Sequence, residues 1–311
     1  MMALRQRPGE LLAVTGATGF VGQSVLEQAA RSGVEVRALT RREQPPREGV
    51  EWVRGDLNDG PALKRLLSGA GVVLHIAGVV NAPDMAGFHE GNVTGTLNVV
   101  NAALAGGVER FIHVSSLSVR EPQLSDYGTS KRKGEMIVKA SSLDWTVVRP
   151  PAIYGPRDTE MFELFKLAKT GIIPLPPGGR ASVIHVSDLA RLLIALIPGG
   201  EDVTSQTFEP DDGTLGGWDQ VALARAIGMA MGRRVWPLPL PRWLLEWAAK
   251  LDRLIRGDKA KLTADRVSYM SHPDWTVSES ARPPASLWEP QVETAIGLHA
   301  TAAWYKEEGW L

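Results

Sequence analysis

A glycine-rich turn near the start of the chain constrains the fold more than any other feature of the sequence. Residues 14–22 read Val-Thr-Gly-Ala-Thr-Gly-Phe-Val-Gly and follow an apolar run at residues 11–14. Apolar residues then recur at helical spacing up to Ala30. A strand, a glycine turn and a helix in this order are typical of a helix N-terminus that binds a pyrophosphate. The sequence therefore predicts that the chain binds a dinucleotide.

The three glycines of the turn have separate expected roles. Gly16 permits a tight turn, Gly19 lets the backbone approach the pyrophosphate, and Gly22 lets the helix pack close to the strand. The residues of this segment that we expect to contact the cofactor are Thr15, Gly16, Thr18, Gly19, Phe20, Val21 and Gly22. An ordinary glycine-rich turn is the alternative, which the flanking strand and helix patterns disfavour.

A second motif carries acid–base chemistry. Tyr127 and Lys131 are four residues apart and would share one face of a helix. A phenol has a pKa of about 10, and we expect the neighbouring ammonium to stabilise the phenolate and lower that pKa. Such a pair can exchange a proton with a substrate hydroxyl or carbonyl near neutral pH. An apolar strand at residues 110–114 precedes the pair and ends in Ser115 and Ser116.

The T-G-x-x-G-x-x-G spacing and the Tyr-x-x-x-Lys pair resemble the short-chain dehydrogenase/reductase superfamily, in its extended, epimerase/dehydratase-like branch. The resemblance covers nearly the whole chain. It implies an α/β fold with a Rossmann-type doubly wound parallel sheet, formed by residues 1–150 and completed by parts of 183–210. A smaller C-terminal substrate-binding lobe would come mainly from residues 151–311. It also implies that Tyr127 is the acid/base, that Lys131 tunes it and holds the nicotinamide ribose, and that Ser116 polarises the substrate oxygen.

The resemblance assigns further cofactor contacts along the chain. Asp56 would touch the adenine, and Asn92 would steady the active site. The other expected contacts follow strands or start helices, and they are Leu57, Ala77, Gly78, Ser115, Pro150 and Ile153, together with Tyr127 and Lys131 themselves. His75, His185 and Asp188 are interpreted as structural residues.

The cofactor is expected to be NADP in preference to NAD. Family members that use NAD carry an acidic residue after the second strand, which binds the adenosine ribose. Here residues 34–40 are followed by Arg41 and Arg42, which would bind a 2′-phosphate through charge-assisted hydrogen bonds. The alternative is that both arginines are solvated and the site accepts either cofactor.

Departures from the family pattern narrow the expected chemistry. The dehydratases carry an Asp-Glu pair after the active-site hydroxyl, whereas Leu117 and Ser118 stand here, so dehydration is disfavoured. Many nucleotide-sugar enzymes carry an asparagine where this chain has Ala152. The Arg149-Pro150 pair is more like the branch that contains 3β-hydroxysteroid dehydrogenases and dihydroflavonol reductases.

The second half of the chain adds further expected elements. Short strands are expected at residues 183–184 and 207–208, with helices over 187–197 and 217–231. Residues 236–256 form an amphipathic, tryptophan-rich stretch in which basic residues are interspersed. This stretch could pack on the core, line an apolar pocket, lie on a membrane surface or form a homodimer contact. We expect Trp236, Trp243 and Trp247 to favour a hydrophobic substrate, with Arg180 as a remaining phosphate partner.

Composition excludes several other classes. A net charge of −1 gives no general attraction to nucleic acid. The chain has no cysteine, which excludes disulfides, thiolate nucleophiles and cysteine-bound metal, and no metal is expected. Residues 1–10 lack an apolar signal core, and no apolar run approaches the ~20 residues of a membrane span, so a cytoplasmic location is expected.

The sequence thus predicts an NAD(P)-dependent oxidoreductase. It would transfer a hydride between nicotinamide and a secondary alcohol or ketone, on a small and hydrophobic substrate. A nucleotide-sugar 4-epimerase, which uses the same triad, remains the alternative enzyme. A non-catalytic NADP-binding sensor or assembly factor remains the alternative of another class.

Overall fold

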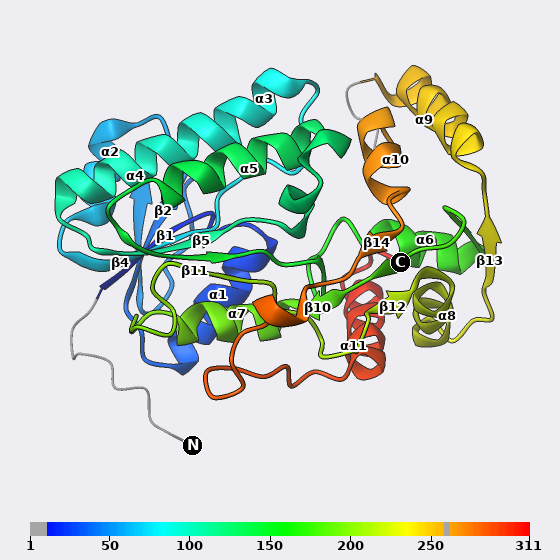
Figure 1. The fold of residues 1–311 in the computed structure, drawn as a ribbon. Helices are drawn as coiled ribbons and strands as arrows, with labels where there is room; N and C mark the ends of the chain where they lie inside the picture. Colours follow the sequence, from blue (N-terminus) through cyan, green and yellow to red (C-terminus); the bar gives the residue numbers. More distant parts are fainter. Residues whose placement is uncertain (1–10, 258–261) are drawn as a thin grey trace.

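The computed structural model describes residues 11–257 and 262–311 (Figure 1). Its centre is a seven-stranded sheet in the order β11-β6-β5-β4-β1-β2-β3, in which every neighbouring pair is parallel. The strands are β1 (Leu11–Thr15), β2 (Val36–Thr40), β3 (Val50–Arg54), β4 (Ala70–His75), β5 (Arg110–Val114), β6 (Asp144–Val148) and β11 (Gln206–Phe208). This confirms the predicted doubly wound Rossmann-type fold.

Helices cover both faces of this sheet, as Figure 1 shows. On one face lie α1 (Phe20–Arg31) and α7 (Val186–Ala195), which pack together over an apolar cluster that includes Leu12, Val25 and Leu193. On the other lie α2 (Gly60–Leu67), α4 (Gly95–Gly106) and α5 (Asp126–Lys139). Because both faces are buried, the central strands are near-continuous apolar runs.

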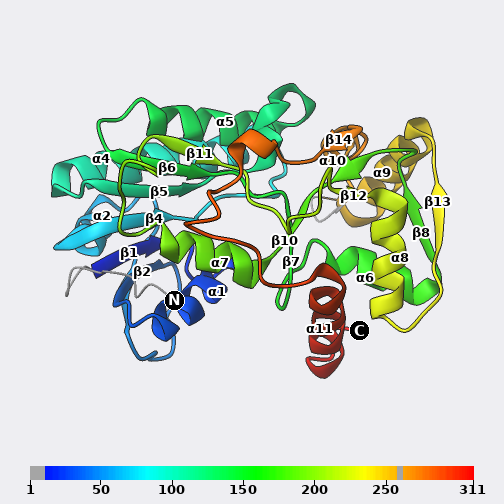
Figure 2. The ribbon, with the colours of Figure 1, turned by 60° about the horizontal axis from the view of Figure 1, so that its bottom comes forward.

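A smaller lobe lies at one end of the sheet (Figure 2). Its helices are α6 (Phe162–Thr170), α8 (Gln220–Ala230), α9 (Arg242–Arg256), α10 (Ala264–Met270) and α11 (Thr294–Glu307). Outside the lobe, the short helix α3 (Met85–His89) precedes a π-helical turn (Glu90–Thr94) that leads into α4. Its strands form small separate sheets and are β7 (Ala152–Tyr154), β8 (Ile172–Leu175), β9 (Arg180–Ala181), β10 (Val183–His185), β12 (Trp218–Asp219), β13 (Trp236–Pro239) and β14 (Asp274–Trp275). A separate apolar cluster around Tyr154, Phe165 and Tyr305 holds this lobe together.

Two boundaries differ from the sequence-based expectation. The helix expected over 217–231 begins at Gln220, because Gly217 has a φ of +61° and the Asp219 carboxylate caps the backbone N–H groups of Val221 and Ala222. The helix expected over 187–197 is α7, which begins one residue earlier and ends two residues earlier. Of the segment 183–210, β11 joins the main sheet, whereas β10 pairs with β7.

The expectation that Trp236, Trp243 and Trp247 favour a hydrophobic substrate is not supported by their positions, because they do not line an enclosed pocket. Trp236, Trp243 and Trp247 are 69%, 61% and 64% exposed. The reason is that α9 contacts the rest of the lobe through a narrow stripe that contains Leu245 and Ala249, and its broader apolar side faces outward. Within the two described ranges, no helix combines the length and apolar character that crossing a bilayer requires. The predicted absence of a signal core concerns residues 1–10, which lie outside the described residues.

Candidate active site

The turn between β1 and α1 has the shape that its glycines predict. Gly16 has a φ of +79°, and a Cβ atom there would lie 2.6 Å from the Ala77 nitrogen. At Gly22 a Cβ atom would lie 2.1 Å from the Gly16 carbonyl oxygen, so α1 packs directly against the turn. Around Gly19, by contrast, only the Gly16 carbonyl comes within ordinary contact, at 3.4 Å. The turn is therefore open only at Gly19.

The start of α1 is chemically suited to an anion. Gly19 is the N-cap residue, no side chain caps the helix, and its first turn contains no acidic residue. The first backbone N–H groups of a helix lack intrahelical partners and carry the positive end of the helix dipole. Phe20 and Val21 lie in this first turn, and Thr18 is exposed beside it. These residues fit the pyrophosphate of a dinucleotide.

The ends of β1 and β4 are joined by buried side chains. The Thr15 hydroxyl lies 2.7 Å from His75 Nδ1 and accepts a hydrogen bond from the Ala77 backbone N–H. His75 Nε2 lies 3.0 Å from the Thr96 hydroxyl. Burial, with the nearby charge of Lys131, lowers the pKa of His75 to about 3. His75 is therefore neutral and fixed between two hydroxyls, in agreement with a structural role.

Asn92 connects the β4 end to α5. Its amide donates to the Val79 carbonyl and to the Ser130 hydroxyl, both at 2.9 Å, and its Oδ1 accepts from the Val79 backbone N–H. It lies in the π-helical turn before α4, where α5 comes so close that a Cβ atom at Gly134 would lie 2.4 Å from the Asn92 carbonyl oxygen. A Cβ atom at Gly78 would lie 3.5 Å from Lys131 Nζ. Asn92 thus fixes the position of the helix that carries Tyr127 and Lys131.

Ser116, Tyr127 and Lys131 come together where β5 ends and α5 begins. The Ser116 hydroxyl lies close enough to Tyr127 to influence its pKa, and it accepts hydrogen bonds from the backbone N–H and the hydroxyl of Ser118. Lys131 is buried, and its ammonium donates to the Val114 carbonyl at 2.8 Å. The structure therefore brings the three predicted catalytic side chains to one place.

The expected lowering of the Tyr127 pKa is not found. Burial raises the pKa of Tyr127 above its usual value of 10, and the nearby Ser116 hydroxyl only partly opposes that effect. The pKa that is lowered is that of Lys131. Burial brings it down to about 8, and the charge of Glu135 opposes this effect only in part. In this site Tyr127 is a protonated phenol at neutral pH, and it can donate a proton to a substrate oxygen.

Ser115 has a different role from Ser116. Its hydroxyl donates to the Glu135 carboxylate at 3.0 Å. Arg149 bonds the same carboxylate through Nε and Nη2, at 3.0 and 2.6 Å, and bonds Glu209 through Nη1 at 3.2 Å. Lys139 lies 2.6 Å from Glu135. Ser115 therefore belongs to a buried ionic cluster beneath the catalytic face and does not point at the reacting atoms.

A basic hollow lies at the same edge of the sheet, beyond β2 and β3. It has a volume of about 470 Å³ and is lined by Arg41, Arg54, Gly55, Asp56, Asp59 and Arg65. The Asp59 carboxylate caps α2, and the Asp56 carboxylate accepts the Asn58 backbone N–H, so both acids already have partners. Arg42 is exposed and does not line the hollow.

Sequence reasoning predicted Arg41 and Asp56 as cofactor contacts but did not consider Arg54 and Arg65, which line the same hollow. Arg54 is the last residue of β3, and Arg65 lies on α2. Because parallel strands end at one edge of a sheet, the position of Arg54 directly before the Gly55-Asp56 pair could have revealed it. No sequence signal brings Arg65 from the helix to that edge.

The remaining predicted contact residues have backbone or packing roles in the structure. Leu57 packs against Gly95: a Cβ atom added at Gly95 would lie 2.6 Å from Cδ1 of Leu57. The Pro150 carbonyl accepts the Leu117 backbone N–H at 3.0 Å. Ile153 lies in β7, paired with Ile184. Two nitrogens of Arg180 donate to the carbonyls of Gly216 and Gly217, at 2.5 and 2.8 Å, which leaves it poorly placed as a phosphate ligand.

Helix α10 also borders the site, which sequence reasoning did not predict. Its Asp265 carboxylate accepts the backbone N–H of Asp126 at 2.7 Å, next to Tyr127. Tyr269 is close enough to Tyr127 that this neighbour, after burial, contributes to raising the Tyr269 pKa. Arg266 pairs with Glu160 of the lobe. Phe88 contacts Tyr127 from the other side, with ring centroids 6.2 Å apart.

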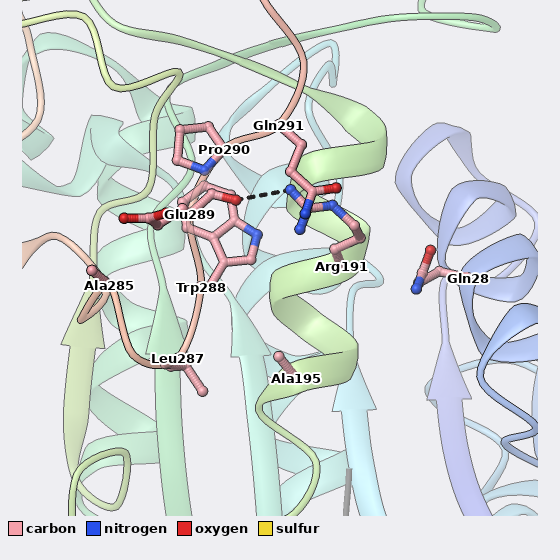
Figure 3. Close-up of a pocket in the computed structure, with 9 residues that line it drawn as sticks. All are labelled: Gln28, Arg191, Ala195, Ala285, Leu287, Trp288, Glu289, Pro290 and Gln291. Atoms are coloured by element: carbon pink, nitrogen blue, oxygen red, sulfur yellow. Dashed lines mark hydrogen bonds between the residues drawn. The ribbon is translucent and has the colours of Figure 1, made fainter. Parts of the chain in front are cut away.

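A second hollow lies away from this chemistry, between α1, α7 and residues 285–291 (Figure 3). Arg191 lines it but donates to the Asp188 carboxylate and to the Glu289 carbonyl. Asp188 also accepts the backbone N–H groups of Gln291 and Val292, and the His185 ring caps α7. Asp188 and His185 thus hold this part of the lobe to the sheet, as their interpretation as structural residues predicted.

The comparisons with known proteins agree with this geometry. The model of the NAD dependent epimerase/dehydratase family matches residues 12–208. A ceramide reductase of Caulobacter vibrioides is 36% identical over 310 residues, which cover 97% of this chain and 96% of that protein. A UDP-glucose 4-epimerase of Vibrio cholerae is 28% identical over 324 residues, with coverage of 94% and 96%. The solved structure of MoeE5 in complex with UDP-glucose and NAD shares the fold, with a TM-score of 0.73, 21% identity and coverage of 96% and 99%.

The glycine turn and the catalytic face thus define a Rossmann-type, nicotinamide-dependent enzyme. The chain belongs to the NAD-dependent epimerase/dehydratase family, and it is an NAD(P)-dependent oxidoreductase of the extended short-chain dehydrogenase/reductase type.

Proposed function

We propose that this chain is an NADP-preferring reductase of a hydrophobic ketone, working through Ser116, Tyr127 and Lys131. The observation that carries the proposal is the Tyr127 phenol, which lies beside Ser116 and is held protonated by burial. A protonated phenol suits the reductive direction, in which the substrate oxygen gains a proton. The same pair serves the reverse oxidation only after the phenol has lost its proton.

Each of the three side chains has a defined task in this scheme. When bound, the nicotinamide supplies the hydride. The Ser116 hydroxyl hydrogen-bonds the ketone oxygen, and the Tyr127 Oη proton passes to that oxygen as its charge develops. The Lys131 ammonium, fixed by the Val114 carbonyl, lies one helical turn from Tyr127 and stabilises the phenolate that remains. The Gly16–Gly22 turn holds the pyrophosphate, with Ala77 and Gly78 beside it.

The basic hollow supports the choice of NADP. Three guanidinium groups, from Arg41, Arg54 and Arg65, line it, and its two carboxylates already have backbone partners. It lies at the carboxyl ends of β2 and β3, where this fold binds the adenosine ribose. A 2′-phosphate placed there would gain charge-assisted hydrogen bonds that a 2′-hydroxyl cannot form.

Arg41→Ala is therefore expected to weaken NADPH binding much more than NADH binding. Loss of one charge-assisted bond, worth about 1.5–3 kcal/mol, corresponds to a roughly 10- to 150-fold higher Kd for NADPH. Fluorescence titration with both cofactors measures this, and Arg31→Ala, at an exposed residue of α1, is the matched control. Equal affinities of the unaltered protein for NADPH and NADH would contradict the assignment.

The substrate is proposed to be a ketone on a lipid-like, long-chain molecule. Ala152 offers no amide for a sugar-nucleotide phosphate, and Arg180 is engaged by two backbone carbonyls. The relative from Caulobacter vibrioides, which aligns over nearly the full length of both proteins, is named a ceramide reductase. Burial of a long chain supplies about 25 cal/mol per Å², which holds such a substrate without an ionic anchor.

A panel assay tests this proposal. NADPH oxidation is expected with the 3-oxo form of a ceramide and with simpler long-chain ketones, and not with UDP-glucose. Calorimetric titration with UDP in the presence of NADP should show no binding. Tight binding of UDP together with failure to bind any ketone would overturn the substrate class.

A nucleotide-sugar 4-epimerase is the second candidate. The relative from Vibrio cholerae, named a UDP-glucose 4-epimerase, also aligns over nearly all of its length. An epimerase returns the hydride to the substrate and retains its cofactor. Tightly bound NAD that co-purifies with the protein would favour this candidate.

A further inference from the structure

Helix α9 presents its apolar face to the outside of the molecule. Its outward residues are Trp243, Leu244, Trp247, Leu251, Leu254 and Ile255, which are 61%, 36%, 64%, 57%, 83% and 72% exposed. Only Leu245 and Ala249 of this helix are buried. The helix lies at the outer edge of the lobe, next to α10 (Figure 1). A surface helix normally turns its apolar stripe toward the core, so this face lacks the cover that its composition predicts.

The helical spacing separates the two faces. At 100° per residue, the six outward residues fall on one broad arc, and Leu245 and Ala249 fall on the opposite side. On the preceding strand β13, Trp236 and Leu238 are also exposed, at 69% and 42%. We call these eight outward residues the α9 surface. It is apolar and rich in tryptophan, and its residues lie within 236–255.

Basic residues border this surface. Helix α9 contains four arginines or lysines and two acidic residues, although the whole chain has a net charge of −1. Both acids are paired within the helix, Glu246 with Arg242 at 2.8 Å and Asp252 with Arg256 at 3.1 Å. The Lys250 ammonium lies 5.3 Å from the centre of the Trp247 ring. An apolar face with tryptophans and a basic rim complements an anionic lipid surface.

We propose that the α9 surface is a docking site for a membrane with anionic headgroups. The tryptophans would lie at the headgroup level, with the leucines and Ile255 below them and the basic rim against the phosphates. A second copy of the chain fits less well, because a symmetric contact through α9 would bring the two basic rims together. The docked helix lies in the plane of the interface and does not cross the bilayer.

The docked surface is physically connected to the catalytic face. Leu245 and Ala249 of α9 pack on Val267 of α10, and Asp265 of α10 bonds the backbone beside Tyr127. A membrane bound at α9 would therefore lie next to the helix α10 that borders the site. This link rests on the proposed function, since it matters only for a substrate that resides in the bilayer.

Vesicle co-sedimentation with the full-length protein tests the docking itself. We expect binding to vesicles of equal parts phosphatidylglycerol and phosphatidylcholine, and weaker binding to phosphatidylcholine alone. Trp243→Ser with Trp247→Ser should reduce binding by roughly tenfold or more. Lys250→Gln with Arg253→Gln should remove the preference for the anionic vesicles and retain residual binding. The matched control is Leu215→Ser with Met229→Ser, which alters residues 75% and 71% exposed outside α9 and should bind as the unaltered protein does.

Several outcomes would overturn the proposal. One is that the unaltered protein does not bind vesicles, and another is that the tryptophan variant binds as well as its control. Light scattering supplies a third, in which a dimer of the unaltered protein becomes a monomer in the tryptophan variant, which would assign the face to a second copy. Circular dichroism checks that each variant is folded.

An activity measurement separates this proposal from the proposed function. The tryptophan variant should reduce a short, water-soluble ketone at the unaltered rate and lose rate only on a long-chain ketone delivered in anionic vesicles. Absence of activity on every ketone, together with intact vesicle binding, would contradict the proposed function and leave the docking surface standing. Equal rates of the variant and the unaltered protein on the vesicle-borne ketone would contradict the link to the site.

Discussion

Replacement of Tyr127 by phenylalanine is expected to lower kcat by roughly 10²- to 10⁴-fold, because general acid catalysis typically contributes that factor. The substitution removes one hydroxyl and keeps the ring against Phe88, as well as the Lys131 ammonium on the Val114 carbonyl. The affinity for NADPH should therefore be unchanged. Single-turnover kinetics with saturating NADPH separate the chemical step from binding.

Tyr269→Phe is the matched control for this variant. Tyr269 is the neighbouring tyrosine on α10, and removal of its hydroxyl leaves the Ser116–Tyr127 contact in place. Its turnover is expected to stay close to that of the unaltered enzyme. A Tyr127→Phe enzyme that keeps most of its kcat would exclude Tyr127 as the proton donor.

Arg149→Met is expected to lower the free energy of unfolding by about 3 kcal/mol, at the lower end of the range for breaking a buried ion pair. Arg149 makes two bonds to Glu135 and one to Glu209, and the two glutamate side chains are 5% and 3% exposed. The loss is not larger because Lys139 remains beside Glu135 and Arg120 remains 3.6 Å from Glu209. Urea denaturation measures the difference.

The stability lost in Arg149→Met should be smaller at acidic pH than at neutral pH. Burial acts to raise the pKa of Glu135, but its bonds and charge interactions with Arg149 and Lys139 bring the pKa below the usual value. The corresponding stabilisation is therefore present above the unfolded-state pKa and is lost as the pH falls through the lower folded-state pKa. The gap between Arg149→Met and the unaltered protein should narrow toward acidic pH. Arg242→Met, in the exposed pair with Glu246, should cost less than about 1 kcal/mol at any pH.

Local sequence patterns predicted the parts of the site that depend on local geometry. The turn at Gly16 and Gly22 follows from steric contacts within a few residues of the turn and with the adjoining strand. Tyr127 and Lys131 share a face because they are one helical turn apart. Ser116 could be predicted because it follows a buried parallel strand, and such strands end at the ligand-binding edge of the sheet.

Features that depend on packing between distant segments could not be predicted. The raised pKa of Tyr127 comes from burial under α10 and the lobe, which no spacing rule encodes. Arg65 reaches the basic hollow only because α2 packs beside β3. The amphipathic pattern of α9 was plain in the sequence, but periodicity cannot show which face of the helix packs on the protein. In this structure the narrow stripe with Leu245 and Ala249 packs on the protein, and the broader apolar face is exposed.

Transfer of deuterium from NADPH to the product tests the central claim most directly. The enzyme is incubated with a long-chain ketone and NADPH that carries deuterium at C4 of the nicotinamide, and the product is examined by mass spectrometry. The reductase account predicts one deuterium on the new alcohol carbon for each NADP released, and at most about 1% of that transfer with Tyr127→Phe over the same period. No labelled alcohol from any ketone, combined with interconversion of UDP-glucose and its 4-epimer on retained cofactor, would contradict it.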